Sequence, residues 1–529
     1  GDYERRIQNV AAGEVSATST DGINGSQLYA VANTLSKNMS SYMHINDGTS
    51  TQTVGNAITN YGYSGSKAGA TGTKAIAGGM NAQASGDDAI AMGTWSSAAG
   101  EKAVAQGAHS TATDKGAVAI GGSYELSNAV KAENKGAVAI GSISTNIAGN
   151  DSLRGSVASG KNSIAILGST GGENAVAMGT FASATANSSI AIGKKSLSSS
   201  AGSIAIGENT RVIDVNTGTI NSGSMVAIGK GFSAIGNKSV VIGFNNGNDS
   251  ASPMVAGNES VILGNQSSVW TNKITSGTMT SIDDIPKGSH IIGNRSMITE
   301  SKDSVVVGND STITNADESI AIGKKASVEA ANSIAIGSGA KASGEKSISI
   351  GTGNEVKGAK SSAIGDPSYI DTTATGTHVQ GNDNGTATNP IKASESTFMG
   401  NTNLAGTAGT TGIHVVGNNN SVDSSNVMVM GNGVTVGTGL DGAVVLGNAS
   451  SANQYAAATD STINGVTFEA AGYAGNTGLN KGSIVSVGAT GVERQIKNVA
   501  AGAVTATSTD AINGSQLYKT AETILKMPI

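Results

Sequence analysis

Histidines and paired acidic residues are the side chains in this sequence that could perform acid–base or metal chemistry. No H-E-x-x-H motif occurs, and the histidines have no ligand-like spacing. They are His44, His109, His290, His378 and His414. The adjacent pairs Asp87–Asp88 and Asp283–Asp284 do not suit hydrolysis, because neighbours on a strand face opposite ways and a glycosidase needs two carboxylates on one surface. We therefore expect isolated histidines and solvated acidic turns, and we assign no catalytic residue, metal site or cofactor.

One glycine motif could bind a nucleotide. The segment "GTGLDG" at 437–442 matches G-x-G-x-x-G, but a phosphate site also needs a helix N-terminus after the glycines. The strand-like "AVVLG" follows instead, so the sequence predicts a structural turn. The glycine–aspartate repeats of a calcium-binding β-roll are also missing. Cysteine is absent, which excludes disulfides, thiolate chemistry and cysteine–zinc sites.

The composition indicates a thin, repetitive β structure. Among 529 residues there are 75 glycines, aromatic residues make up only 3%, and Ala, Val and Ile dominate the hydrophobic 38%. The net charge of −6 and the lack of a basic stripe argue against nucleic-acid binding. No uninterrupted apolar run is long enough to span a bilayer, so no transmembrane helix is predicted. The sequence begins "GDYERR" without a signal peptide, and we expect it to be a piece of a longer chain.

Pentads that end in glycine recur along most of the chain. The copies include "AIAMG", "AVAIG", "SIAIG" and "SVVVG". Many of their glycines follow one another at intervals of fourteen: Gly79, Gly93, Gly107 and Gly121; Gly179, Gly193 and Gly207; and Gly323, Gly337, Gly351 and Gly365. The repeats therefore predict a solenoid in which one interval makes one coil.

The pentad at 333–337 predicts a short strand with two different faces. Ile334 and Ile336 point one way, and Ser333 and Ala335 point the other way. We expect the isoleucines to mark the buried face and the final glycine to permit a tight turn.

A second short run, "AKASG" at 340–344, completes the coil. Here Ala340 and Ala342 are expected to face inward and Lys341 to face water. Stacked coils would form parallel ladders rising ~4.8 Å per coil. Because the pentads are apolar or small on both faces, and a flat roll has one interior, something else must cover the second face. The economical cover is another copy of the chain in closed cyclic symmetry, which predicts an oligomeric rod.

Several coils exceed the period, and we expect their insertions to form surface loops. These stretches include Gly121–Gly141, Gly207–Gly229 and Gly264–Gly293. Trp270 beside Lys273 is the sharpest candidate for partner contact, because Trp and Arg are enriched in binding hot spots. Arg211 and Tyr124 rank lower, and the alternative for Trp270 is packing under its own loop.

The two ends of the chain carry a second kind of repeat. The segments 4–29 and 493–518 match at 21 of 26 positions. After the first, Leu28, Leu35 and Tyr42 are spaced by seven, which predicts a short coiled coil. An apolar line after the second segment predicts another helix.

The "NSIAIG"-type repeats, followed by "ERQIKNVAAGAVTATSTDAINGSQLY", resemble the head and neck of YadA-like trimeric autotransporter adhesins. The resemblance implies an all-β, left-handed parallel β-roll of three chains, with necks that narrow the head onto coiled coils. It also implies a bacterial cell-surface protein held in the outer membrane by a C-terminal anchor that is absent from this fragment. The domains it implies are an N-terminal neck (1–29), a short coiled-coil helix (30–42), a connector (43–70), the head (71–447), an inserted subdomain (448–492), a C-terminal neck (493–518) and the start of a stalk (519–529).

The resemblance implies a non-enzymatic homotrimer that attaches to host cells, extracellular-matrix proteins or other bacteria. Repeats like Asn332 to Gly337 have been implicated in collagen binding in some relatives, but we interpret them here mainly as scaffold. A spacer or fibre without its own ligand and a polysaccharide-processing β-solenoid enzyme remain alternatives. An ice-binding solenoid would need an outward Thr-x-Thr ladder, which is missing.

Overall fold

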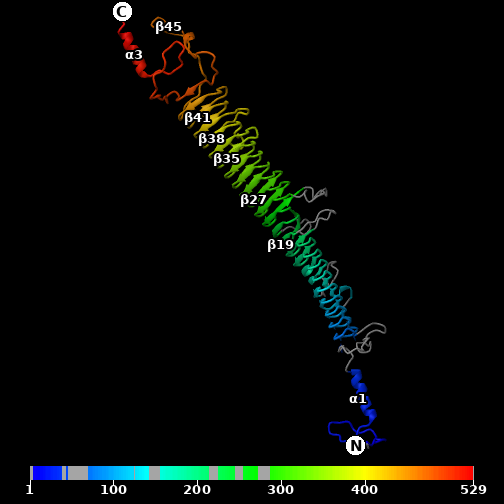
Figure 1. Ribbon diagram of the computed structural model, residues 1–529. Coiled ribbons are helices and arrows are strands. Elements are labelled where there is room, and N and C mark those ends of the chain that lie inside the picture. The colour runs from blue at the N-terminus through cyan, green and yellow to red at the C-terminus, as the bar shows by residue number, and fades with distance from the viewer. Residues whose placement is uncertain are drawn as a thin grey trace. The chain divides into compact units, whose positions relative to one another are not determined.

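The computed structural model describes residues 4–38, 43–45, 69–123, 126–141, 155–213, 224–244, 254–271 and 286–527 (Figure 1). It is an all-β parallel solenoid of about 23 turns with short helices near its ends, which confirms the predicted fold class. The chain divides into two compact units, which we describe separately. The first comprises Gly1–Glu259 with Thr280–Ile282, and the second comprises Ser260–Met279 with Asp283–Ile529.

Each coil contributes one strand to each of two parallel ladders. We call the stack of glycine-ended pentad strands the pentad ladder, and the stack of the intervening strands the second ladder. As an example, β31 (Ile334–Ile336) pairs in register with β33 (Ile348–Ile350), and β32 (Lys341–Ala342) pairs with β34 (Glu355–Val356). The same residue type therefore recurs directly above itself, coil after coil.

The first unit begins with helix α1 (Gly25–Asn38) and contains the 3-10 turn η1 (Leu126–Asn128). Strand β1 (Met43–Ile45) runs antiparallel to β3. Its pentad ladder consists of β3 (Ile76–Gly78), β5 (Ile90–Met92), β7 (Val104–Gln106), β9 (Val118–Ile120), β11 (Val138–Ile140), β13 (Ile164–Thr170), β14 (Val176–Ala184), β15 (Ile190–Ile192), β17 (Ile204–Ile206), β19 (Val226–Lys230) and β21 (Val240–Phe244). Its second ladder consists of β2 (Gly69–Ala70), β4 (Gln83–Ala84), β6 (Ser97–Ala98), β8 (Thr111–Ala112), β10 (Lys131–Ala132), β12 (Val157–Ala158), the ends of β13 and β14, β16 (Leu197–Ser198), β18 (Arg211–Val212), β20 (Ser233–Ile235) and β22 (Met254–Ala256).

The second unit repeats this plan. Its pentad ladder consists of β23 (Val261–Leu263), β25 (His290–Ile292), β27 (Val305–Val307), β29 (Ile320–Ile322), β31, β33, β35 (Ser362–Ile364), β37 (His378–Gln380), β38 (Thr397–Met399), β39 (His414–Val416), β41 (Met428–Met430), β43 (Val444–Leu446) and β46 (Val485–Ser486). Its second ladder consists of β24 (Ser268–Trp270), β26 (Met297–Thr299), β28 (Thr312–Thr314), β30 (Ser327–Val328), β32, β34, β36 (Tyr369–Ile370), β40 (Ser421–Val422) and β42 (Thr435–Val436). An antiparallel hairpin, β44 (Ser461–Ile463) and β45 (Val466–Phe468), the 3-10 turn η3 (Ala470–Gly472) and helix α3 (Gly514–Leu525) complete the unit.

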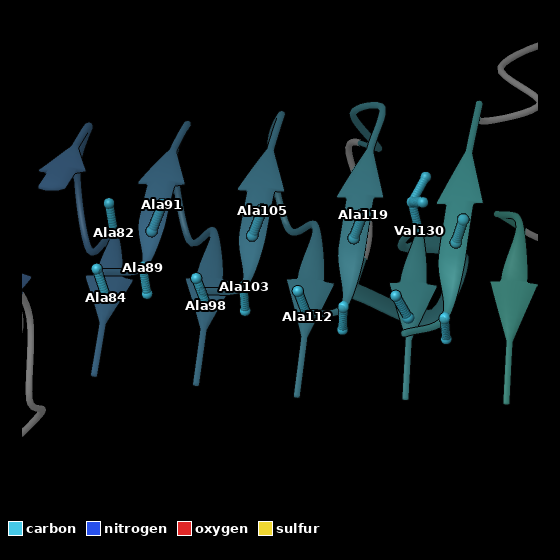
Figure 2. Packing of buried hydrophobic residues seen from close by; sticks show 14 of the residues in the cluster. Ala82, Ala84, Ala89, Ala91, Ala98, Ala103, Ala105, Ala112, Ala119 and Val130 are labelled. Atoms are coloured by element: carbon cyan, nitrogen blue, oxygen red, sulfur yellow. The ribbon is translucent and has the colours of Figure 1, made fainter. Parts of the chain in front are cut away.

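The interior of a coil is formed by the small residues, not by the isoleucines. Ala335 and Ser333 are fully buried, whereas Ile334 and Ile336 are only half-buried on the outer face. The prediction that the isoleucines mark the buried face is therefore wrong for the single chain. The space between the two ladders of a regular coil is narrow, so it accepts alanine and leaves the longer side chains outside. Figure 2 shows such alanines stacked coil upon coil in the first unit.

Coil length sets the size of the interior residues. In the second unit, coils one residue longer than the regular period contain three-residue second-ladder strands such as β28. Their interiors hold Ile298, Val306 and Ile313, each fully buried. The additional residue widens the coil enough for β-branched side chains, so packing remains dense without alanine.

Backbone crowding explains the glycine that ends most pentads. Gly337 has φ +133°, and a Cβ placed on it would lie 2.1 Å from the carbonyl oxygen of Gly351 in the next coil. No L-residue adopts this conformation or this contact without displacing the neighbouring coil. The regular spacing of these glycines therefore results from the close stacking of turns in successive coils.

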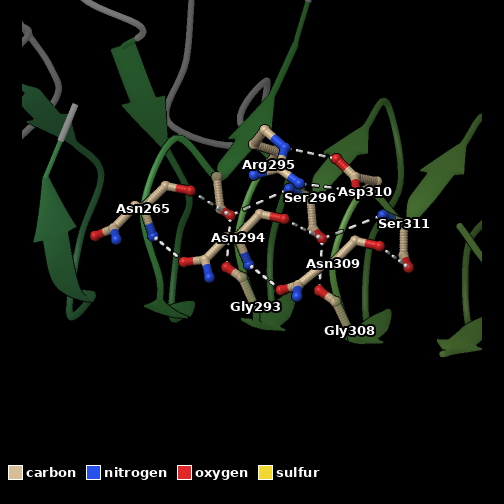
Figure 3. Close-up of polar contacts among 10 residues, drawn as sticks. Asn265, Gly293, Asn294, Arg295, Ser296, Gly308, Asn309, Asp310 and Ser311 are labelled. Carbon is tan, nitrogen blue, oxygen red and sulfur yellow. Dashed lines mark hydrogen bonds and ion pairs between the residues drawn. The ribbon is translucent and has the colours of Figure 1, made fainter. Parts of the chain in front are cut away.

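Asparagines after several of these glycines form a second set of contacts along the turns (Figure 3). The side-chain oxygen of Asn294 accepts a hydrogen bond from the backbone N–H of Asn265 at 2.9 Å, and that of Asn309 accepts one from Asn294 at 3.0 Å. Beside them, Arg295 donates to Asp310 through Nε at 2.7 Å and Nη2 at 2.9 Å. Side chains thus satisfy turn N–H groups that the parallel ladders leave free.

Candidate ligand-binding surfaces

The outer side of the pentad ladder is a largely apolar surface without formal charge. Each pentad strand presents the two residues that flank its buried central residue. In the described part of both units, none of these flanking positions is Lys, Arg, Asp or Glu. Many are exposed in the single chain, including Met430 at 53%, Ile292 at 52% and Val416 at 47%. An extended exposed apolar surface of this kind marks an interaction site.

The outer side of the second ladder is polar and carries both signs of charge. Lys341 lies between Glu329, at 3.0 Å, and Glu355, at 3.9 Å, and Lys357 lies 3.2 Å from Glu355. Ala342 next to it is fully buried, so the prediction that Lys341 faces water is confirmed. This surface suits contact with water or with a polar partner, whereas the pentad surface suits burial.

Trp270 and Arg211 lie in strands, not in the insertions where we expected them. Trp270 is the last residue of β24, is half-buried, and pairs in register with Thr299. Arg211 is the first residue of β18 and is exposed. Both side chains alternate with a fully buried valine, so both lie on the outer side of the second ladder. Regular coil geometry extends further toward each insertion than glycine spacing indicated.

The other two predicted contact residues, Lys273 and Tyr124, lie outside the described residues.

Sequence inspection missed a stacked aromatic pair on the turns of the first unit. Trp95 is 40% exposed and stacks on His109, with ring centroids 6.3 Å apart and planes within 4°. Both residues have positive φ, at +59° and +60°, and occupy the same turn position in successive coils. Their separation in the sequence equals the coil period, and this spacing could have predicted that the two rings lie next to each other.

The acidic pair and the glycine motif that we considered as possible functional sites form turns. Asp87 and Asp88 are exposed turn residues, as predicted, and Asp87 accepts a hydrogen bond from the backbone of Thr73. The segment 437–442 forms turns that lead into β43, so no helix N-terminus follows its glycines. Asp283 and Asp284 lie outside the described residues. Within the ranges that the structure describes, no cluster of His, Asp and Glu could hold a metal ion, and no helix could cross a membrane.

Surface ion pairs hold several carboxyl groups in the charged form. The Arg295 guanidinium lowers the pKa of Asp310, mainly through its hydrogen bonds to the carboxylate. Lys115 likewise lowers the pKa of Glu101 in the first unit. These are solvent-exposed pairs between neighbouring coils, which gives them a structural rather than a catalytic character.

The N-terminal repeated segment folds back onto the start of its helix. Gln27, in the first turn of α1, donates from Nε2 to the carbonyl oxygen of Gly13 at 2.6 Å and accepts from the N–H of Gly13 at 3.1 Å. Asn24 donates to the carbonyl oxygen of Val10 at 3.2 Å. Two amide side chains thus fasten an otherwise extended segment to a helix end.

The C-terminal repeated segment contains the same network. Gln516 donates to Gly502 at 2.7 Å and accepts from it at 3.1 Å, and Asn513 donates to Val499 at 3.0 Å. Asn513 also caps α3 in a capping box with Gln516. The two segments therefore share a local structure, which explains why both amides recur.

Arg494 joins the C-terminal segment to the last coil. Its guanidinium donates to the Ser450 hydroxyl at 3.0 Å and to the carbonyl oxygens of Val487 at 2.8 Å and Asn448 at 2.7 Å. Beyond this coil, Ala470 is the one buried apolar side chain among the described residues from 451 to 527. This part of the chain exposes apolar side chains that a single copy does not cover.

Comparisons with known proteins match both kinds of repeat. A family model described as the coiled stalk of trimeric autotransporter adhesin matches residues 6–51 and 495–526. The YadA head domain repeat matches residues 70–96, 84–105, 98–123, 154–166, 171–196, 315–340 and 342–366.

Individual relatives match shorter stretches. The autotransporter adhesin BtaE of Brucella suis biovar 1 is 40% identical over 81 residues, which are 15% of this chain and 10% of BtaE. The C-terminal YadA-like domain of a Burkholderia pseudomallei protein is 41% identical, with 21% of this chain and 45% of that chain covered and a TM-score of 0.15. Head repeats fall on the coils and stalk matches fall on the two folded-back segments with their helices, so the family models support a YadA-like trimeric autotransporter adhesin.

Proposed function

We propose that this chain is the head-and-neck part of a bacterial cell-surface adhesin that acts as a homotrimer. The full-length protein would be anchored in the outer membrane and would attach the cell to host cells, extracellular matrix or other bacteria. The observation that carries the proposal is the contrast between the two outer surfaces: one is apolar and free of charge, and the other is polar. The matches to the stalk and head models of trimeric autotransporter adhesins support the adhesive role and the trimer.

Three copies could cover one another's pentad surfaces and leave their second ladders facing water. Exposed Ile, Val and Met side chains would then be buried between copies, at about 25 cal/mol per Å² of apolar area removed from water. The accessible polar surfaces would be repeated three times around the assembly. Weak contacts made by identical surfaces strengthen one another through effective concentration, so strong attachment needs no single high-affinity site.

Assembly is tested by measuring the molar mass of the folded chain. Light scattering is expected to give three times the 52.0 kDa of a single copy. A stable 52.0 kDa monomer would overturn the proposed architecture.

Trp270, Arg211, Lys273 and Tyr124 remain the proposed contact residues. Trp270 has the strongest support, because a half-exposed indole on the accessible surface is typical of a hot spot. Binding of the purified chain to an array of matrix proteins, glycans, host cells and bacteria identifies its target surface. There, Trp270→Ala should reduce binding about tenfold.

Thr299→Ala is the matched control, because Thr299 neighbours Trp270 in register and its hydroxyl makes no hydrogen bond. Equal binding by both variants would remove Trp270 from the contact surface. A stable trimer that binds nothing on the array would instead favour a spacer or fibre.

A further inference from the structure

One coil in the first unit is shorter than the regular period. Its interior residue Ala165 pairs in register with Ala177, twelve positions later, whereas Ala177 pairs with Ala191, fourteen positions later. Glycine spacing did not reveal the shortened coil, because its pentad, "SIAIL" at 163–167, ends in leucine instead of glycine.

The shortened coil lacks the turn that otherwise connects the two ladders. Strand β13 bends directly from the pentad ladder into the second ladder, and the register with β14 shifts between Ile166 and Gly168. The bend is made by Leu167, at φ +56°. In the neighbouring coil, Phe181 lies within β14 at φ +60°. Positive φ is uncommon for residues as bulky as these, so surrounding contacts must hold them in place.

The missing residues leave an open cavity of about 380 Å³ beside the bend. Leu167 and Phe181 line it, together with Val157 of the second ladder and the serines Ser159 and Ser169. Among the described residues that line the cavity, none is charged. Its size and mainly apolar lining are those of a small ligand pocket.

The serine hydroxyls of the cavity are already engaged within the chain. The Ser159 hydroxyl donates to the carbonyl oxygen of Thr170 at 2.7 Å, and the Ser169 hydroxyl contacts that of Ser183 at 3.4 Å. A sugar would need free donors and acceptors to replace its hydration. An uncharged apolar group needs only a dry surface, which Leu167, Phe181 and Val157 provide.

We propose that this cavity, the short-coil pocket, receives an aromatic or branched aliphatic side chain of a protein ligand. The proposal rests on the proposed adhesive function. The pocket opens among residues of the second ladder's outer side, which stays accessible when pentad surfaces pack together. One anchoring side chain per copy would give the trimer three identical contacts.

The full chain can be tested with small probes by saturation-transfer NMR. The probes are N-acetyl-phenylalaninamide, N-acetyl-lysinamide and methyl β-glucopyranoside. We expect signal transfer to the phenylalanine probe alone. Val157→Phe fills the pocket and should reduce this signal about tenfold. Leu197→Phe is the matched control, because Leu197 is also an outward aliphatic residue of the second ladder but does not line the pocket.

Each other outcome contradicts the proposal. No transfer to the wild-type chain, or equal transfer in Val157→Phe, means that the pocket takes no apolar side chain. Transfer to the glucoside alone means that it binds sugar. A changed molar mass in Val157→Phe, with Leu197→Phe unchanged, means that a second copy of the chain fills it. None of these measurements requires adhesion, so a failure of the adhesive function would be detected separately, on the binding array.

Discussion

At the scale of the residue, side-chain size decides which face of a strand lies inside. Ala335 fits between the ladders and the flanking isoleucines do not, although isoleucine gains more from burial. The rule inverts the usual hydrophobic pattern, in which the larger residue marks the core. The outcome is a chain that keeps its best apolar side chains for contacts beyond itself.

Pentad glycines should tolerate no side chain. Gly337→Ala places a Cβ against the Gly351 carbonyl and should destabilise the fold by about 3 kcal/mol or more. Urea unfolding followed by circular dichroism should show this as a lower midpoint. Gly339→Asn is the control: φ is +69°, and the nearest neighbour of its Cβ would be 4.0 Å away. The control should stay within about 0.5 kcal/mol of wild type. Similar midpoints for both variants would show that coil stacking does not set the glycine period.

The Arg295–Asp310 pair should stabilise the fold at neutral pH and not in acid. Because the pKa of Asp310 is lowered from 3.8 in the folded chain, its contribution is present above that value and is lost as pH falls through the folded-state pKa. Asp310→Asn should therefore lower the unfolding midpoint slightly at pH 7, and this difference should disappear as the pH falls through the folded-state pKa. A difference that persists in acid would assign the effect to packing.

At the scale of the element, the necks show how a long motif can encode one local structure. Both copies use an Asn and a Gln near a helix start to hold an extended segment. The first helix starts at Gly25, inside the segment we assigned to the neck, so neck and helix form one element. The remaining domain boundaries stay predictions.

Loss of a neck amide should loosen that neck alone. Gln516→Ala removes the paired hydrogen bonds to Gly502, each worth about 1 kcal/mol, so exchange of the Gly502 N–H should accelerate about tenfold or more. Hydrogen exchange followed by mass spectrometry reports this change. Gln27→Ala is the matched control and should affect Gly13 in the same way. If each variant loosened both necks, the two segments would not be independent elements.

At the scale of the whole molecule, the proposed function depends on separating two surfaces. In the proposed trimer, burial between copies would penalise a charge on the pentad surface, whereas the charged second ladder would face water. Trp270 and Arg211 lie on the second ladder of their respective units, although we predicted them in loops. Each residue neighbours a buried valine on its strand, so its side chain must point outward. The sequence would have predicted this if we had assumed that each strand continues up to the start of its insertion.

A charge on the pentad surface should therefore prevent assembly. Ile348→Lys puts an ammonium on the half-buried outer side of β33, where burial between copies would cost several kcal/mol. Light scattering should then report monomers. Thr312→Lys adds the same charge to the second ladder, on β28, and should remain trimeric. Dissociation of the Thr312→Lys variant, with the Ile348→Lys variant intact, would reverse the assignment of surfaces.

The sequence by itself determined the coil, its glycine turns and the paired necks, because each depends on local periodicity or on a long repeated motif. Only the tertiary structure decided that Ala335 lies inside and Ile334 outside, since that depends on the distance between ladders, which no single strand encodes. It also revealed the short-coil pocket and the Trp95–His109 stack. Both arise where side chains of separate coils meet, so their geometry follows from stacking rather than from any one repeat.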